Sequence, residues 1–356
     1  MFGRRNKPTV TEEAVMAAMS TVIEPELHRD LVSLNMVREL EIKGNDVAFT
    51  IMLTTPACPL KDVMQRDSEF ALRRDVPQIG KITIGWDANV PKNRRLSDMG
   101  HNFKNTIAVA SGKGGVGKST ISVNLAIALA QTGASVGLMD ADILGPNVPM
   151  MMGVDRLPPT RNKKIVPAEA FGVKFVSTAF LLKPDQALVW RGPMLNSAIN
   201  QFLSDVDWGE LDYLIVDLPP GTGDAPLSLA QALPLTGAVI VTQPMGVAAA
   251  DALRGIKMFE QLKVPILGVV ENMSGEFFGT GAGEKLATRT NSEFFGIVPL
   301  DARIRIGGDQ GKPIVAVSPN AEAAQSIFSI AQKVAARVSI LTLQNQGNFI
   351  PIQMIG

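Results

Sequence analysis

The first ninety residues carry short segments in which apolar and polar positions alternate or recur with a helical period. Thr11-Glu12-Glu13 precedes an apolar stretch, a typical capped helix start in which acidic residues favour the positive end of the helix dipole. Gly44-Asn45-Asp46 separates two segments with strand alternation and predicts a hairpin. The predicted elements are a helix over 14–19, strands over 37–42 and 47–53, a helix over 60–76 and a strand over 81–86. We therefore expect a small α/β domain over 1–90.

The pattern changes after residue 105, where short and nearly continuous apolar runs recur. Helix-compatible segments separate most of them, and this arrangement predicts a doubly wound, mostly parallel sheet with helices on both faces. Ligands bind beyond the carboxyl ends of such strands. The runs are Ile107–Val109, Val136–Met139, Val173–Val176, Tyr213–Val216, Ala238–Val241 and Ile266–Val270. We expect a linker over 91–104, the large α/β domain over 105–340 and a C-terminal tail over 341–356.

Composition excludes several classes of site. The 356 residues contain one cysteine, Cys58, and two histidines, His28 and His101. One cysteine cannot form a disulfide within the chain, and three Cys and His residues are too few for an ordinary structural zinc site. A cluster held by four thiolates of one chain is excluded for the same reason. The single cysteine is consistent with a reducing compartment.

Charge and hydropathy argue against two kinds of partner. The chain has 34 Lys and Arg against 34 Asp and Glu, so its formal net charge is zero. A protein that tracks nucleic-acid phosphates needs an excess of basic residues, and we expect no nucleic-acid partner. No apolar run is as long as a transmembrane helix, and the basic start lacks the apolar stretch of a signal peptide. We expect a cytoplasmic protein without a membrane partner.

A glycine-rich segment follows the strand at 107–110 and opens a helix. Residues 112–119 satisfy the pattern G-x-x-x-x-G-K-[ST], whose backbone N–H groups surround phosphate oxygens at the positive end of a helix. Lys118 is expected to reach the β- and γ-phosphates, and Ser119 is expected to bind Mg²⁺. The expected phosphate-binding residues are Gly112, Lys113, Gly114, Gly115, Val116, Gly117, Lys118, Ser119 and Thr120. The segment predicts a Mg²⁺-dependent ATP site.

The second lysine, Lys113, gives the loop the form K-G-G-x-G-K-[ST]. This form resembles the deviant Walker A loop of the family that contains the Min and Par ATPases, the nitrogenase iron protein and the Mrp-type iron–sulfur carriers. In that family the extra lysine reaches the partner's phosphates across a nucleotide sandwich dimer. The resemblance implies a homodimer in which Lys113 takes part in catalysis; the alternative is a solvated loop lysine.

Acidic residues follow two of the predicted strands. Asp217 comes directly after the strand Tyr213–Val216, the Walker B arrangement for holding Mg²⁺. The following Pro-Pro-Gly-Thr-Gly suits a switch that senses the γ-phosphate. Asp142 stands where the family places the carboxylate that orients the attacking water, and its alternative is a turn cap.

The base site is expected after the strand that ends at Val270. An amide side chain can both donate to and accept from a purine edge. The resemblance assigns the adenine-reading role to Asn272, and it assigns the loop that flanks the base to Pro299-Leu300-Asp301. A plain turn is an equally good interpretation of that second loop.

Longer segments resemble the Mrp branch in particular. They are 140–147, 216–224, 311–315 and an N-terminal unit similar to the small domain of iron–sulfur assembly factors, with Thr54-Thr-Pro-Ala-Cys-Pro59 as its motif. This likeness covers residues 11–338. It implies a P-loop NTPase fold and an ATP-hydrolysing, homodimeric iron–sulfur cluster carrier that works with client or assembly proteins.

One feature of that branch is missing. Its Asn-Met-Ser is normally followed by C-x-x-C, whose thiols bridge a cluster between two subunits, whereas Ser274 here leads directly into Gly-Glu-Phe-Phe-Gly. Cys58 is the remaining candidate ligand for an iron–sulfur cluster. A position near a helix N-terminus could lower its pKa, whereas a buried apolar role is equally common for a free cysteine. His28 is expected to pack rather than to bind metal.

Three functions remain in competition. The first is an Mrp-type ATPase of iron–sulfur cluster handling, and its variant is an ATPase adaptor that no longer carries a cluster. The second is a positioning ATPase of the Min or Par type, disfavoured because residues 341–356 contain no Lys or Arg for a membrane-binding helix. The third is an electron donor like the nitrogenase iron protein, which the absent cysteines exclude.

Overall fold

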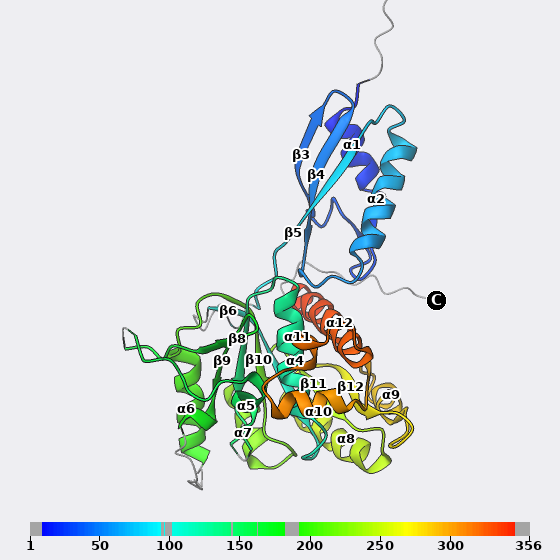
Figure 1. The fold of residues 1–356 in the computed structure, drawn as a ribbon. Helices are drawn as coiled ribbons and strands as arrows, with labels where there is room; N and C mark the ends of the chain where they lie inside the picture. Colours follow the sequence, from blue (N-terminus) through cyan, green and yellow to red (C-terminus); the bar gives the residue numbers. More distant parts are fainter. Residues whose placement is uncertain are drawn as a thin grey trace, which may run out of the picture. The chain divides into compact units, whose positions relative to one another are not determined.

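The computed structural model describes residues 9–93, 96, 102–143, 145–161, 163–181 and 192–345. The chain forms two compact units that divide between Val90 and Pro91, and Figure 1 labels their elements. We describe each unit by itself.

The first unit packs two helices on a small sheet. Its three-stranded sheet has the order β3-β4-β5, with β3 and β4 antiparallel and β4 and β5 parallel. Inward-facing residues of β4 alternate with outward-facing ones, and the buried set includes Val47, Phe49 and Ile51. The elements are α1 (Glu12–Met19), β1 (Ile23–Glu24), β2 (Arg29–Asp30), β3 (Val37–Lys43), β4 (Asp46–Leu53), α2 (Lys61–Asp75) and β5 (Ile82–Ala88). The predicted helices and hairpin are therefore present.

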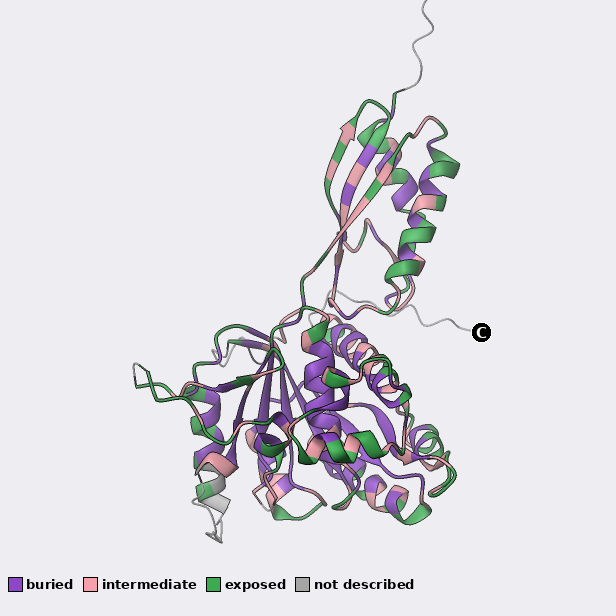
Figure 2. Ribbon diagram, in the orientation of Figure 1, coloured by how far each residue is buried: buried purple, intermediate pink, exposed green. Residues whose placement is uncertain are grey.

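The second unit is built on one eight-stranded sheet. Its order is β13-β12-β11-β6-β10-β7-β9-β8, and only the β8–β9 pair is antiparallel. The strands are β6 (Phe103–Ser111), β7 (Val136–Asp140), β8 (Ala168–Ala170), β9 (Val173–Ser177), β10 (Leu211–Asp217), β11 (Gly237–Thr242), β12 (Ile266–Ser274) and β13 (Phe294–Pro299). The central strands are buried along their whole length (Figure 2). The predicted doubly wound, mostly parallel sheet is confirmed.

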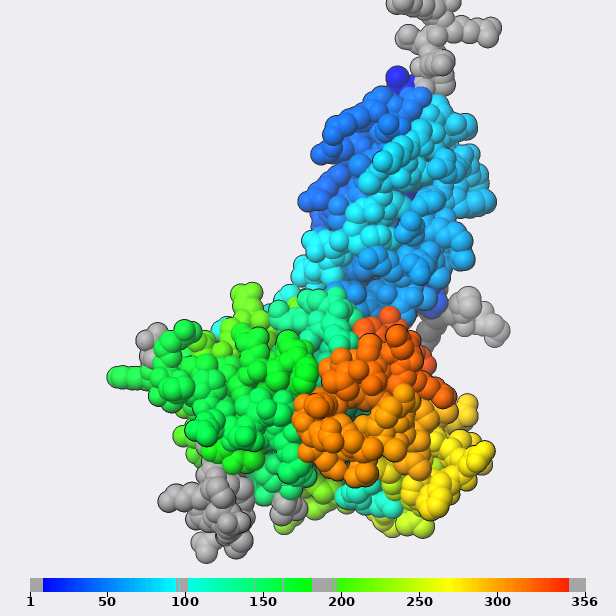
Figure 3. Space-filling view, in the orientation of Figure 1, coloured from blue at the N-terminus to red at the C-terminus, as the bar shows by residue number. Residues whose placement is uncertain are grey.

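Helices cover this sheet. The long α12 packs on α4 and on β13, whereas α10 contacts α5; the orange α10 segment lies against the green α5 segment in Figure 3. The helices are α4 (Lys118–Gln131), α5 (Val148–Met152), α6 (Gly192–Ser204), α7 (Asp224–Ala232), α8 (Gly246–Gln261), α9 (Ala282–Arg289), α10 (Ala302–Asp309), α11 (Ile314–Val317) and α12 (Glu322–Asn345), with a 3-10 turn at Thr178–Leu181.

Two boundaries differ from the expectation. β6 begins at Phe103, inside the predicted linker, because Phe103 is buried and pairs with Leu211 of β10. Residues 94, 95 and 97–101 of that linker lie outside the described residues, as does His101. α12 continues to Asn345, so the first residues of the predicted tail are helical, and residues 346–356 are not described.

Two edge strands were not expected from the apolar runs. β8 has three residues, and β13 alternates between buried and half-exposed positions. An edge strand has one free side and needs no continuous apolar run, which removes the signal used for the central strands. Among the described helices, α12 alone has the length and hydropathy of a membrane span, and half of that window is buried inside this unit. Such burial is typical of a core helix.

Candidate nucleotide site

The glycine-rich loop lies between the end of β6 and the start of α4, at the carboxyl edge of the sheet. α4 begins at Lys118, and its N-cap Gly117 adopts the left-handed conformation with φ of 82°. Gly115 also has a positive φ of 79°. The first N–H groups of a helix have no carbonyl partner one turn earlier, so they can donate to an anion. The strand, loop and helix thus form the phosphate-binding geometry expected from the sequence.

Lys118 is the charged centre of this loop. Its side chain is only 6% exposed, and its Nζ lies 2.8 Å from Oδ1 of Asp217 and 3.5 Å from Oδ2 of Asp142. A buried ammonium group next to two carboxylates is compensated in the nucleotide-free chain. A phosphate group could therefore replace a carboxylate as its partner.

Asp217 is the last residue of β10 and is fully buried. Its Oδ2 accepts a 2.5 Å hydrogen bond from the hydroxyl of Ser119, and its Oδ1 accepts one of 2.6 Å from Ser122. Hydroxyl and carboxylate oxygens are the ligands that Mg²⁺ prefers, together with water and phosphate oxygens. Within the described residues no group of three or more His, Cys, Asp and Glu could hold a metal ion. Ser119 and Asp217 place two such oxygens 2.5 Å apart.

Asp142 makes the turn-capping contact that was one of the two interpretations considered for it. Its Oδ1 accepts a hydrogen bond from the Gly145 N–H at 3.3 Å, which is a turn-capping contact. It also lines the phosphate cavity, where its other oxygen faces Lys118.

A third acid, Asp140, lies behind the site at the end of β7, opposite Asp217 in the sheet register. It accepts hydrogen bonds from the hydroxyl of Ser177 at 2.7 Å and from the Val148 N–H at 3.3 Å. Burial and the neighbouring Asp217 carboxylate raise the pKa of Asp140 to about 8. Desolvation and a like charge both disfavour the ionised form of a carboxyl group.

This raised pKa predicts a pH-dependent stability. The folded chain keeps the Asp140 proton up to about pH 8, whereas the unfolded chain releases it near the ordinary aspartate pKa of 3.8. Stability is therefore lost as pH rises between these values, by at most about 1.4 kcal/mol per pH unit. The stability of Asp140→Asn relative to the native chain should therefore increase from pH 5 to pH 8. Urea unfolding midpoints of both proteins at the two pH values measure this difference. The exposed Asp155→Asn should show no such trend; an equal gain at both pH values for Asp140→Asn would contradict the assignment.

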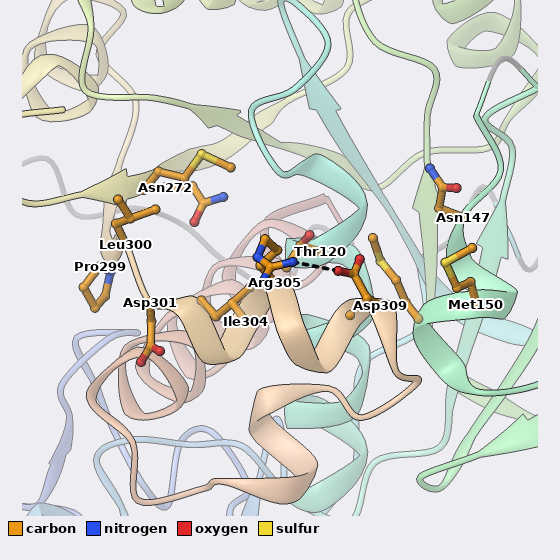
Figure 4. Close-up of a pocket in the computed structure, with 13 residues that line it drawn as sticks. Thr120, Asn147, Met150, Asn272, Pro299, Leu300, Asp301, Ile304, Arg305 and Asp309 are labelled. Atoms are coloured by element: carbon orange, nitrogen blue, oxygen red, sulfur yellow. Dashed lines mark hydrogen bonds and ion pairs between the residues drawn. The ribbon is translucent and has the colours of Figure 1, made fainter. Parts of the chain in front are cut away.

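Two cavities adjoin at this edge of the sheet. The phosphate cavity, of about 350 Å³, is lined by the loop together with Asp142, Gly145 and Pro220. The second cavity, of about 340 Å³, is lined by Asn272, Met273 and residues of α5 and α10 (Figure 4). Thr120, Asn147 and Met151 line both. The two adjoining cavities, one lined by Lys118 and the other by Asn272 and Met273, leave room for the phosphates and the nucleoside of a nucleotide.

Asn272 lies in the second cavity and contacts the loop. Its Nδ2 donates a 2.9 Å hydrogen bond to the carbonyl of Val116. A methyl group on Gly117 would collide with that same amide nitrogen. The glycine is thus required by its φ angle and by the approach of Asn272. This bond uses one of the two amide N–H donors, so one N–H and Oδ1 of Asn272 make no hydrogen bond among the described residues.

Pro299, Leu300 and Asp301 line the same cavity, and Figure 4 shows them beside Asn272. Asp301 is at the same time the N-cap of α10, accepting a hydrogen bond from the Arg303 N–H at 2.8 Å. The turn is therefore present, and it lines the same cavity as Asn272.

Lys113 also lines the phosphate cavity, and its side chain is half-buried. The hydroxyl of Ser111 donates to the Lys113 carbonyl at 2.9 Å and fixes the backbone there. No ion pair joins its ammonium group to any acid among the described residues. Its charge is thus available to a phosphate of the same or another chain.

Sequence reasoning missed several residues of the second cavity. Met150 and Met151 come from the short α5, and Ile304, Arg305 and Asp309 come from α10. The Arg305–Asp309 ion pair is drawn in Figure 4. Neither helix contains a recognised binding motif. The one available signal was Asn147, which follows Asp140-Ala-Asp142 in the chain and is the N-cap of α5.

Cys58 lies in the first unit, just before α2, and is half-buried against the apolar core. Burial raises the pKa of its thiol to about 11, and the carboxylates of Glu26 and Glu24 act in the same direction. Of the two interpretations left open for Cys58, the buried one therefore fits, because desolvation outweighs any lowering of the pKa by the helix N-terminus. His28 is exposed with φ of 53°, so the expectation that it packs is wrong.

The segment that replaces C-x-x-C forms a tight hairpin after β12. The Gly275 N–H donates to the Gly279 carbonyl at 3.0 Å, and the Gly279 N–H donates to the Gly275 carbonyl at 2.7 Å. Phe277 at its tip is 81% exposed, and its ring meets Phe278 edge to face at 4.8 Å. The hairpin offers aromatic surface where the resembled branch has thiols.

Family comparison identifies both units. Residues 102–335 match the model described as ParA, NUBPL iron-transfer P-loop NTPase, and residues 12–84 match the model described as iron–sulfur cluster assembly protein. A Synechocystis protein named iron–sulfur cluster carrier protein is 47% identical over 354 residues, covering 94% of this chain and 99% of its own length. An Escherichia coli protein with the same name is 46% identical, covering 76% of this chain and 77% of its own.

Solved structures give the same fold. A nucleotide-binding protein from Archaeoglobus fulgidus in complex with ADP is 38% identical, with a TM-score of 0.54 over 61% of this chain and 89% of its own. The cell division ATPase MinD of Pyrococcus furiosus is 24% identical, with a TM-score of 0.53 over 65% of this chain and 98% of its own. The second likeness concerns the fold alone.

Proposed function

Because this chain belongs to the iron-transfer P-loop NTPases, we propose that it is a Mg²⁺-dependent ATPase that carries or assembles iron–sulfur clusters as a nucleotide-gated homodimer. The observation that carries the proposal is the buried group of Lys118, Ser119 and Asp217 at the mouth of the glycine-rich loop. Phosphoryl transfer needs positioned charges and a metal rather than covalent chemistry; Lys118 supplies a charge, and Ser119 and Asp217 would hold the metal.

In the proposed reaction the loop N–H groups and Lys118 hold the β- and γ-phosphates. Ser119 and Asp217 would hold Mg²⁺, which supplies charge neutralisation between the phosphates. Asp142, capped by Gly145, orients the attacking water and accepts its proton. Asn272 reads the base through its free Oδ1.

The homodimer is proposed from Lys113. Its ammonium group lines the phosphate cavity without an ion pair among the described residues, and the resemblance gives this position to the lysine that crosses to a partner's phosphates. Binding of ATP would close two copies, and hydrolysis would reopen them. The free energy for such a change comes from the difference in nucleotide affinity between the two states.

The cluster is proposed as cargo, with part of its ligands from outside the chain. A dimer supplies two copies of Cys58, while a cluster bound by thiolates takes four. Small thiols or the thiols of a client would complete the set. We place the protein in the cytoplasm, where thiols stay reduced.

Anaerobic reconstitution of the full chain with iron and sulfide, in the presence and absence of glutathione, tests the cargo. We expect the visible absorption of a cluster only with glutathione, and we expect Cys58→Ser to lose it. Persistence in Cys58→Ser would overturn Cys58 as ligand. The absence of a cluster in both proteins would overturn the carrier role and leave an ATPase adaptor.

A further inference from the structure

The strand that carries Asn272 ends irregularly. Met273 adopts a left-handed conformation with φ of 60°, and the pairing of β12 with β13 shifts register between Asn272 and Ser274. A residue other than glycine adopts this conformation only where surrounding contacts hold it. Such bulges re-aim side chains next to binding sites. The direction of the Asn272 amide therefore depends on whatever holds this bulge.

The carboxylate of Glu271 holds this bulge in place. This side chain is fully buried and accepts hydrogen bonds from the hydroxyl of Ser274 at 2.9 Å, from the Gly281 N–H at 2.9 and 3.1 Å, and from the Gly283 N–H at 2.6 Å. The bond to Ser274 closes the chain around Asn272 and Met273. The other bonds attach the bulge to the first turn of α9, whose dipole favours a negative charge.

The surroundings of Glu271 are built for this contact. A methyl group on Gly283 would stand 2.8 Å from the Glu271 Cβ, so the close approach needs glycine there. Gly281 has a positive φ of 94°, which also favours glycine. Successive side chains of a strand point to opposite faces, so Glu271 reaches α9 while Asn272 reaches the loop on the other face.

We propose that Glu271, which does not line the nucleotide cavities, is a positioning residue that sets the base selectivity of the site through Asn272; this rests on the proposed nucleotide site. All the partners of the Glu271 carboxylate are donors. Glu271→Gln would turn an amide NH₂ toward the Gly281 and Gly283 N–H groups, so one donor would face another. The bulge would change its conformation, and Oδ1 of Asn272 would no longer point toward the base.

The test separates base recognition from phosphate binding. Calorimetry on the full chain with Mg²⁺ compares ADP, GDP and inorganic tripolyphosphate, which has no base. In Glu271→Gln we expect the affinity for ADP to fall about tenfold or more, the size of one lost charge-assisted or well-aligned hydrogen bond. The preference for ADP over GDP should shrink, whereas tripolyphosphate should bind within about twofold of the native chain.

A matched control makes the same chemical change nearby. Glu276 is exposed on the hairpin, and Glu276→Gln should leave all three affinities unchanged. If Glu271→Gln does not fold, Ser274→Ala removes one donor from the carboxylate and should shift the ADP preference in the same direction by less. Equal loss of tripolyphosphate and ADP affinity, or an unchanged ADP preference, overturns the inference. If the native chain binds neither ADP nor tripolyphosphate, the proposed nucleotide site is overturned instead.

Discussion

Replacing Lys118 by alanine is expected to abolish ATP hydrolysis and to reduce nucleotide affinity by at least about 100-fold. The substitution removes the ammonium group that lies 2.8 Å from Asp217 and 3.5 Å from Asp142. The two carboxylates then remain buried without a cation, and an arriving triphosphate adds negative charge to the same place. Loss of one partner of a buried ion pair costs about 3–5 kcal/mol.

A coupled assay of phosphate release and calorimetry with ADP measure this result. Lys257→Ala is the matched control, because Lys257 is 60% exposed on α8 and pairs with Glu260 outside the cavities. Its turnover should equal that of the native chain. Native turnover in Lys118→Ala would show that phosphate is held elsewhere.

The phosphate half of the site was predictable from the sequence because each of its residues is local to a motif. The glycine-rich loop is continuous in the chain, and Asp217 follows directly after an apolar strand. In a parallel sheet such strand ends meet at one edge, so Lys118 and Asp217 come together although they are far apart in sequence. The structure brings them to 2.8 Å.

The base half was only partly predictable. Asn272 could be named because it ends a buried strand, whereas Met150 and Ile304 come from helices that bring exposed residues to the cavity. The part played by Glu271 could not be predicted, since two of its partners are backbone N–H groups whose positions depend on α9. The pKa shift of Cys58 could not be predicted for a related reason. The burial that raises this pKa depends on the tertiary packing.

The glycines of the loop serve different physical purposes, although the motif treats them alike. A methyl group on Gly112 would overlap the backbone of Asp251 and Ala252 in α8, and backbone cannot move aside as a side chain can. Gly115 has open space around it and needs glycine only for its φ of 79°. Gly246, which lies outside the loop at the first position of α8, has neither restriction. The three positions therefore form a graded series.

Gly112→Ala is expected to be the most damaging of the three, lowering stability by about 3 kcal/mol because the methyl group must separate the loop from α8. Gly115→Ala should lose about 1 kcal/mol through its left-handed conformation alone, and Gly246→Ala should stay within about 0.5 kcal/mol of the native chain. Urea unfolding measures the order, and ADP calorimetry should show that Gly112→Ala also loses nucleotide affinity as the loop moves. If Gly112→Ala and Gly246→Ala proved equally stable, the contact between the loop and α8 would not hold the phosphate site in place.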